Sequence, residues 1–361
     1  MIHSFTCQGF KALDDLRVAL EPFTLFVGPN GCGKSSVLEG IHFLCQLAGR
    51  PTTDPGGLFA GPSAPRRLCF PGRESFVLGA ATANGSFRVT IGTGPTPSGL
   101  VASKFEGSDD AGQWVELSAS TLPRFAGLSS VARLRLDPEQ AKMPSARQAG
   151  RSADLESDGA GLATVIADAL GRRDEMIGRI EDDLAKVVPA ARGIRAAPMD
   201  IELGVQPPFE KRTIKELASH NVVPGHVVQV KMDGVGWLDA DLLSEGTVLV
   251  LALITGLHMS TRPRIVLLDD IDRGLHPQAQ AQFVERIRAL QKEDSELQVI
   301  ATTHSPYLLD SVEPAQVRVM GLRDGRAMCR PLTEHDEWPK WKGSLRAGEF
   351  WGSVGEAWVT A

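Results

Sequence analysis

The stretch Thr24-Leu25-Phe26-Val27-Gly28-Pro29-Asn30-Gly31-Cys32-Gly33-Lys34-Ser35 joins a short apolar run to a glycine-rich loop. The loop matches the pattern G-x-x-x-x-G-K-S over its whole length, and the next segment, Val37 to Leu44, has apolar residues at helical spacing. A strand, a glycine-rich loop and a helix in this order are the context in which the pattern binds phosphate. The sequence therefore predicts an α/β domain that binds a nucleotide.

The composition of the loop explains the chemistry that we expect of it. Its glycines let backbone N–H groups converge on phosphate oxygens, and the helix N-terminus adds a partial positive charge. Lys34 is expected to reach the β- and γ-phosphates, and Ser35 to offer its hydroxyl to Mg²⁺. The predicted nucleotide-binding residues are Gly28, Pro29, Asn30, Gly31, Cys32, Gly33, Lys34, Ser35 and Ser36.

A second apolar run, Ile265 to Leu268, ends in two carboxylates, Asp269 and Asp270. Acidic residues at this position often cap the helix that follows a strand, so the pair is weak on its own. After a complete phosphate loop the catalytic interpretation is favoured. We expect Asp269 to hold Mg²⁺ together with Ser35, and Asp270 to orient the water that attacks ATP.

Two shorter motifs accompany the carboxylates. Leu243-Ser244-Glu245-Gly246-Thr247 opens a predicted helix, and Thr303-His304-Ser305 follows the apolar run Val299 to Thr302. Taken singly, Ser244 is typical of a helix N-cap, and His304 is one of eight histidines. A functional interpretation of these two motifs depends on their order along the chain relative to the phosphate loop and the two carboxylates.

With these four motifs in this order, the chain resembles the ABC-type ATPases of the RecF, OLD and SMC group. The resemblance covers the chain from Met1 to about Arg50 and from about Leu242 to Asp310, and the region between is matched only in kind. It implies an ATP-dependent head-to-tail homodimer in which Ser244, Glu245 and Gly246 act in trans on the γ-phosphate bound by the other head. It also implies that His304 contacts the γ-phosphate and that ATP and Mg²⁺ are the cofactors.

The chain departs from this group in two respects. The group usually has glutamate where this chain has Asp270, which implies slow hydrolysis or a site that has abandoned catalysis. The glutamine of the family's Q-loop has three candidates, Gln46, Gln113 and Gln140, and the sequence does not choose among them.

The remaining segments predict what surrounds this core. Alternating stretches between Phe76 and Leu117 predict an antiparallel layer, and the spacing from Leu162 to Val188 predicts a helical subdomain. The expected fold is α/β, a P-loop NTPase head of the ABC type with an antiparallel β layer and a helical insertion. We expect three regions: 1–150, the N-terminal ATPase lobe; 151–198, the helical insertion; and 199–361, the C-terminal ATPase lobe.

Composition and net charge limit the cellular location and the kinds of partner that we expect. No run approaches the length of a bilayer span and no secretory signal is visible, so we expect a cytoplasmic protein without a membrane partner. The net charge of -6 does not call for DNA, although DNA binding stays open. The five cysteines are scattered, which favours reduced thiols over a metal site.

The resemblance also suggests a biological role. Relatives of the OLD type often carry a Toprim nuclease, but too few residues follow His304 for that domain, so an effector would be a separate polypeptide. Compact relatives are often bacterial anti-phage ATPases that control such an effector. The alternatives are a RecF-like DNA repair clamp and a nucleotide switch or scaffold with little turnover.

Four of the six tryptophans lie near the C-terminus: Trp338, Trp341, Trp351 and Trp358. Clustered tryptophan is typical of a protein interface, and equally of a tail that folds back onto its own sheet. The second interpretation is favoured, because the short segments between them show no periodicity.

Overall fold

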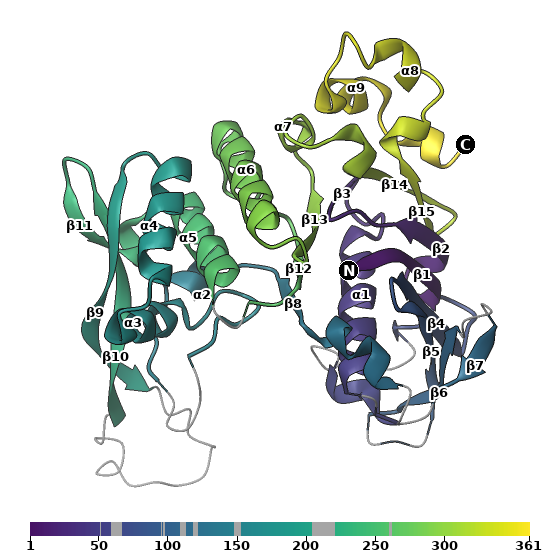
Figure 1. The fold of residues 1–361 in the computed structure, drawn as a ribbon, viewed down its shortest axis with the longest axis horizontal. Helices are drawn as coiled ribbons and strands as arrows, with labels where there is room; N and C mark the ends of the chain where they lie inside the picture. The colour runs from purple at the N-terminus through teal and green to yellow at the C-terminus, as the bar shows by residue number, and fades with distance from the viewer. Residues whose placement is uncertain are drawn as a thin grey trace, which may run out of the picture. The chain divides into compact units, whose positions relative to one another are not determined.

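The computed structural model describes residues 1–50, 52–58, 67–94, 96, 98–108, 113–117, 122–147, 153–203, 221–259 and 262–361. They form two compact units (Figure 1). Unit 1 comprises Met1–Arg133, Pro263–Arg273 and Phe283–Ala361, and unit 2 comprises Leu134–Arg262 and Gly274–Gln282. The expected division at residues 150 and 198 follows other boundaries and stays a prediction.

The central sheet of unit 1 has the strand order β15-β14-β3-β13-β12-β8. At its centre β3 (Phe23–Val27) pairs in parallel with β13 (Gln298–Thr303) and β14 (Val317–Arg323), and β12 (Ile265–Leu268) pairs in parallel with β13. Every residue of β3, β12 and β13 is buried, which is the pattern of a parallel sheet covered on both faces. The predicted strands are therefore confirmed, and their carboxyl ends meet at one edge of the sheet.

The two edge strands of this sheet are β15 and β8. Strands β14 and β15 (Arg326–Pro331) form a hairpin that turns at Asp324 and Gly325, whose φ values are 50° and 76°. Such angles suit the tight turns that match the twist of a hairpin. The far edge is β8 (Val131–Leu134), where the backbone N–H of Ile265 donates to the carbonyl of Ser130.

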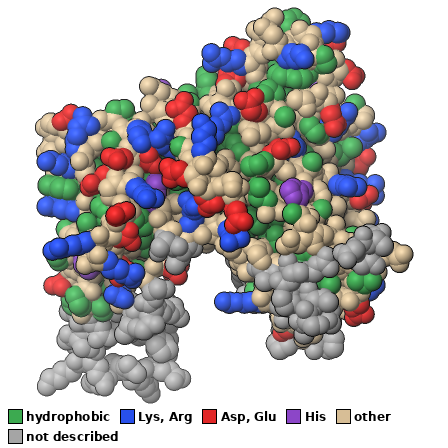
Figure 2. All heavy atoms as spheres, viewed as in Figure 1, with side chains coloured by type: hydrophobic (Ala, Val, Ile, Leu, Met, Phe, Trp, Pro, Cys, Tyr) green, Lys and Arg blue, Asp and Glu red, His purple; other side chains and the backbone are tan. Residues whose placement is uncertain are grey.

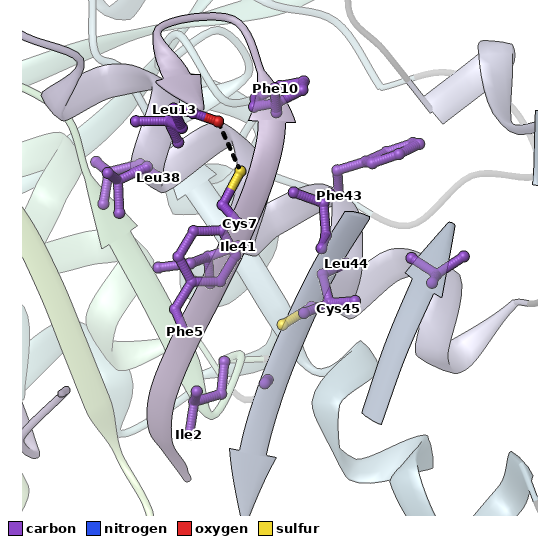
Figure 3. Packing of buried hydrophobic residues seen from close by; sticks show 14 of the residues in the cluster. Ile2, Phe5, Cys7, Phe10, Leu13, Leu38, Ile41, Phe43, Leu44 and Cys45 are labelled. Atoms are coloured by element: carbon purple, nitrogen blue, oxygen red, sulfur yellow. Dashed lines mark hydrogen bonds between the residues drawn. The ribbon is translucent and has the colours of Figure 1, made fainter. Parts of the chain in front are cut away.

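The second sheet of unit 1 is antiparallel, as expected, with the order β2-β1-β4-β5-β6-β7. Its strands are β1 (Ile2–Phe10), β2 (Leu13–Ala19), β4 (Ser75–Thr82), β5 (Gly85–Thr93), β6 (Leu100–Ser108) and β7 (Trp114–Glu116). Helix α1 (Lys34–Gly49) packs between this sheet and the central one, and its Ile41 and Leu44 join Phe5, Phe10 and Leu267 in one core (Figure 3). The core thus fixes the helix that begins at the phosphate loop.

Unit 2 combines helices with a small sheet. Strands β9 (Ala191–Leu203), β10 (Asn221–Met232) and β11 (Gly236–Asp239) form an antiparallel sheet. The helices of this unit are α2 (Pro138–Lys142), α3 (Leu162–Arg172), α4 (Met176–Val187) and α5 (Glu245–His258). Helix α6 (Pro277–Glu293) then continues from this unit into unit 1.

The segment from Leu162 to Val188 is helical, as predicted, but it forms two helices, α3 and α4. The segment forms two helices because Arg173 adopts the left-handed conformation, with φ 57° and its N–H bonded to the carbonyls of Ala169 and Leu170. A residue in this conformation ends a helix. The apolar spacing continues across the break, so periodicity alone could not reveal it.

The C-terminal tail folds back onto unit 1. It contains α7 (Pro306–Leu309), α8 (Trp338–Trp341) and α9 (Ala347–Val354), together with short 3-10 turns. Phe350 is 1% exposed, and its ring lies 5.1 Å from that of Trp338 between centroids. Arg323 of β14 donates to the carbonyl of Thr360 at 2.7 Å. The tail is therefore part of the core of unit 1, whereas Trp341 stays exposed.

Deleting Trp338 to Ala361 is accordingly expected to give an insoluble or strongly destabilised chain, measured by solubility and thermal denaturation. As a point test, Phe350→Ala should lower the free energy of unfolding by about 3–5 kcal/mol, the usual loss for a buried phenylalanine. The exposed Trp341→Ala is the matched control and should change it by less than about 0.5 kcal/mol. A soluble truncation that keeps ATP binding but loses a partner would instead make the tail an interface.

Two further observations concern the surface. On the face shown in Figure 2, basic and acidic side chains are interspersed, as expected of solvated surfaces. Among the described residues no helix is both long and apolar enough to cross a bilayer.

Candidate nucleotide-binding site

The phosphate loop lies between β3 and α1 and depends on its glycines. Gly28, Gly31 and Gly33 have φ values of 152°, 78° and 99°. A Cβ on Gly28 would lie 2.3 Å from the carbonyl oxygen of Met320 on β14, so no other residue fits there without moving the strand. The loop is thus held against the β14–β15 hairpin, and its conformation is left-handed where side chains are disfavoured.

Lys34 is the first residue of α1 and points back into the loop. Its Nζ donates to the carbonyls of Gly28 and Pro29, both at 2.9 Å, and the residue is only 5% exposed. Burial lowers the pKa of Lys34 from its usual value, while Cys32 and the carboxylates of Asp270 and Asp269 oppose the shift. The cation therefore lies where phosphate oxygens would approach the loop.

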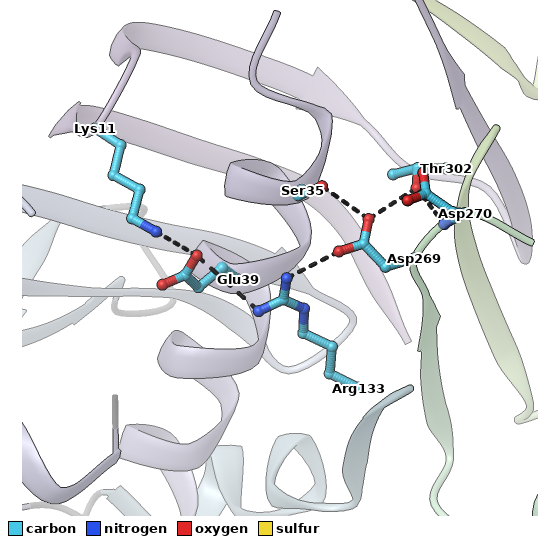
Figure 4. Close-up of polar contacts among 7 residues, drawn as sticks. All are labelled: Lys11, Ser35, Glu39, Arg133, Asp269, Asp270 and Thr302. Atoms are coloured by element: carbon cyan, nitrogen blue, oxygen red, sulfur yellow. Dashed lines mark hydrogen bonds and ion pairs between the residues drawn. The ribbon is translucent and has the colours of Figure 1, made fainter. Parts of the chain in front are cut away.

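Asp269 lies at the end of β12 and contacts Ser35 directly (Figure 4). Its Oδ1 accepts hydrogen bonds from Ser35 Oγ at 2.8 Å and from Thr302 Oγ1 at 2.9 Å. A hydroxyl and a carboxylate side by side are the hard oxygen donors that Mg²⁺ prefers, so these residues fit the ion. No group of three or more His, Cys, Asp or Glu that could hold a metal occurs in the described part of the chain. Oxygens from the phosphates and water would have to complete the coordination.

Asp270 follows with an unusual backbone conformation. Its φ is 56°, its N–H donates to Thr302 Oγ1 at 2.8 Å, and its carbonyl accepts from the N–H of Arg273 at 3.0 Å. Aspartate enters the left-handed region more readily than glutamate does. The half-buried carboxylate has no hydrogen-bond partner among the described residues, so it is available to a water molecule.

His304 and Asp272 lie at the neighbouring strand end. One carboxylate oxygen of Asp272 accepts from Thr303 Oγ1 at 2.7 Å and from the N–H of His304 at 3.3 Å. Asp272 thereby positions the backbone that carries His304, whose side chain is exposed. Loop, carboxylates and histidine all lie at the carboxyl edge of the central sheet.

The Ser244 motif belongs to unit 2. Ser244 caps α5 by accepting from the N–H of Thr247 at 3.2 Å, and a Cβ on Gly246 would lie 2.2 Å from the carbonyl oxygen of Gly274. Both residues thus have structural roles in the single chain, and Glu245 is the first residue of the helix. Their action in trans stays a prediction.

Sequence reasoning missed Arg133, whose guanidinium contacts Asp269 at 2.9 Å. Nothing in the local sequence pattern links it to a carboxylate 136 positions away. Of the Q-loop candidates, Gln46 lies on α1 and contacts His42, and Gln140 lies on α2 in unit 2. The identity of that glutamine stays open.

The fold and the groups at this edge are those of a P-loop ATPase domain. One family model, described as "AAA domain, putative AbiEii toxin, Type IV TA system", matches residues 118–310, and another, "AAA ATPase domain", matches residues 1–60. The first match spans more than half of the chain, and the chain belongs to that family.

Solved structures of SMC heads share the fold. A structure of the SmcHead bound to the C-winged helix domain of ScpA is 16% identical, with a TM-score of 0.60, and the match covers 91% of this chain and 97% of that one. The Smc head domain with an extended coiled coil, bound to the C-terminal domain of ScpA derived from Pyrococcus furiosus, is 13% identical with a TM-score of 0.58, covering 95% and 99%. No curated protein matches the chain in sequence. The expected class and fold are confirmed.

Proposed function

We propose that the protein binds and hydrolyses ATP with Mg²⁺, and that it does so as a head-to-tail homodimer. The observation that carries the proposal is the direct contact between Ser35 and Asp269, 2.8 Å apart, at the edge that also holds the buried Lys34 and Asp270. Cation, metal ligands and candidate base thus lie at one edge. This is the set of groups that phosphoryl transfer to water needs.

Each residue then has a distinct task. Lys34 exchanges its two carbonyl partners for oxygens of the β- and γ-phosphates, which strengthens its hydrogen bonds because both partners are charged. Ser35 and Asp269 would hold Mg²⁺, which neutralises charge on the phosphates when it is bound. Asp270 orients a water toward the γ-phosphate, and His304 supplies a further contact to that phosphate from the adjacent strand.

The dimer would complete the site. Ser244, at the N-terminus of α5, offers a hydroxyl and the partial positive charge of a helix end to an anion on a second chain. ATP would join the two copies, and hydrolysis would separate them. We further propose that this cycle controls a separately encoded effector in the bacterial cytoplasm. The description of the family, which names a putative toxin of a toxin–antitoxin system, supports a role in bacterial defence.

A second candidate function is a nucleotide switch that scarcely hydrolyses ATP. It is favoured by Asp270, whose side chain is one methylene shorter than the usual glutamate. A steady-state assay of phosphate release separates the two candidates, because a switch binds Mg²⁺-ATP without turnover.

The composite site is tested by Ser244→Arg. The bulky cation should leave nucleotide binding to the single chain within a few-fold of the parent, yet abolish ATP-driven dimerisation and turnover. The measurements are light scattering with and without ATP and phosphate release. Ser244→Ala is the control for the lost helix cap, which costs about 1 kcal/mol of stability. Normal hydrolysis by a monomeric Ser244→Arg variant contradicts the composite site.

A further inference from the structure

Arg133 lies beside the proposed metal site, but the proposed phosphoryl transfer gives it no role. It lies on β8, its side chain is 20% exposed, and its terminal nitrogen is 2.9 Å from Asp269 Oδ2. The carboxylate of Asp269 itself is fully buried. A buried carboxylate requires a cation, and Arg133 supplies one to Asp269.

The two oxygens of Asp269 are engaged in different ways. Oδ1 already accepts from Ser35 and Thr302, both hydroxyl donors. A metal ion at Ser35 therefore reaches Asp269, directly or through a coordinated water, by way of Oδ2. That oxygen is the partner of Arg133, so the guanidinium and the metal compete for one atom and repel each other as like charges.

Arg133 also has a second acidic neighbour. Its other terminal nitrogen is 4.0 Å from Glu39 Oε2 on α1, longer than a hydrogen bond, and Glu39 is paired with Lys11 at 2.5 Å (Figure 4). A small shift away from Asp269 would close the gap to Glu39. The guanidinium thus lies between two carboxylates and can exchange one for the other.

We propose that Arg133 is a placeholder for the metal cation: it holds Asp269 in the nucleotide-free protein, excludes Mg²⁺ until a nucleotide supplies phosphate oxygens, and then moves to Glu39. Arg133 is in this role a positioning residue, not a catalytic one. The inference rests on the proposed Mg²⁺ site at Ser35 and Asp269. Its consequence is that metal and nucleotide bind together, and that metal alone binds weakly.

The test measures Mn²⁺ binding to the full-length protein by electron paramagnetic resonance, because Mn²⁺ accepts the same oxygen ligands as Mg²⁺. Without nucleotide, Arg133→Gln should bind Mn²⁺ at least about tenfold more tightly than the parent, since a charge–charge repulsion and a competitor are removed together. Adding Asp269→Asn should abolish the gain. Arg135→Gln, two residues along the chain and exposed, is the matched control and should match the parent. An Arg133→Gln variant with parental or weaker affinity overturns the proposal.

A second variant, for which the opposite change in Mn²⁺ affinity is expected, tests the proposal even if Arg133→Gln does not fold. Glu39→Gln removes the partner to which Arg133 moves, so in the presence of ADP it should weaken Mn²⁺ binding about threefold or more relative to the parent. An unchanged or higher affinity of Glu39→Gln with ADP also overturns the proposal. A separate titration of the parent protein with ATP and ADP tests the proposed function. A parent that binds neither nucleotide contradicts the proposed function rather than this inference.

Discussion

Replacing Lys34 with alanine is expected to weaken the binding of ATP by at least about a hundredfold, the largest effect of any single substitution on affinity. Hydrogen bonds to charged groups contribute about 1.5–3 kcal/mol each, and Lys34 is positioned to make two of them with phosphates. Isothermal titration with ATP measures the loss. Lys340→Ala, whose side chain is 68% exposed, is the control for removing one lysine and should bind like the parent.

The hydrogen bonds of Lys34 within the loop add a condition to this experiment. Lys34 bonds two carbonyls of the loop, so its removal leaves the carbonyl oxygen of Gly28 without that partner. Thermal denaturation without nucleotide must therefore accompany the titration. Unchanged affinity in a folded variant would mean that the phosphate loop has been misassigned.

Replacing Asp270 with asparagine should lower turnover by about a hundredfold or more, because a positioned base contributes on that order to the rate. Asparagine also adopts the left-handed conformation readily, so the φ of 56° should be retained. Lys34, Ser35 and Asp269 would still bind Mg²⁺-ATP, and the ATP-bound dimer should persist. Phosphate release and light scattering after ATP addition measure the two effects. Turnover equal to the parent would show that Asp270 is not the base.

Asp270→Glu tests whether the reach of the carboxylate limits the rate. An added methylene should increase hydrolysis and shorten the lifetime of the ATP-bound dimer, since displacements of about one ångström change rates by on the order of a hundredfold. Glutamate should also destabilise the fold by about 1 kcal/mol, because it tolerates positive φ less well than aspartate. Rates and thermal denaturation of the same sample separate these two effects. A slower, equally stable Asp270→Glu variant contradicts a limit set by reach.

Much of this fold could be predicted from the sequence, because its strands are continuous apolar runs and its phosphate loop has a strict pattern. Both signals are local. The exact break at Arg173 could not be predicted, since the left-handed residue is an arginine and the nearby Gly171 still lies within α3. The partners of β3 could not be predicted from the local sequence either, because the paired residues of β13 and β14 come 276 and 292 positions later.

The candidate site shows the same division. Lys34, Ser35 and Asp269 were predicted from motifs, and the structure brings the last two together. Arg133 could not be predicted as a neighbour of Asp269, because arginine is common in segments of mixed charge. The contact depends on the position of β8 beside β12 in the sheet. The left-handed backbone conformation of Asp270 could not be predicted either, since a backbone angle leaves no trace in the amino-acid composition.

The position of β3 between β13 and β14 has a consequence for how the protein is made. The loop residue Gly28 is synthesised 292 residues before Met320, which lies against that glycine on the strand that supports the loop. At about 5–20 residues per second, the interval is on the order of tens of seconds. A nascent chain therefore carries an unsupported loop throughout this interval, and competence to bind nucleotide arises only after the β14–β15 hairpin has emerged.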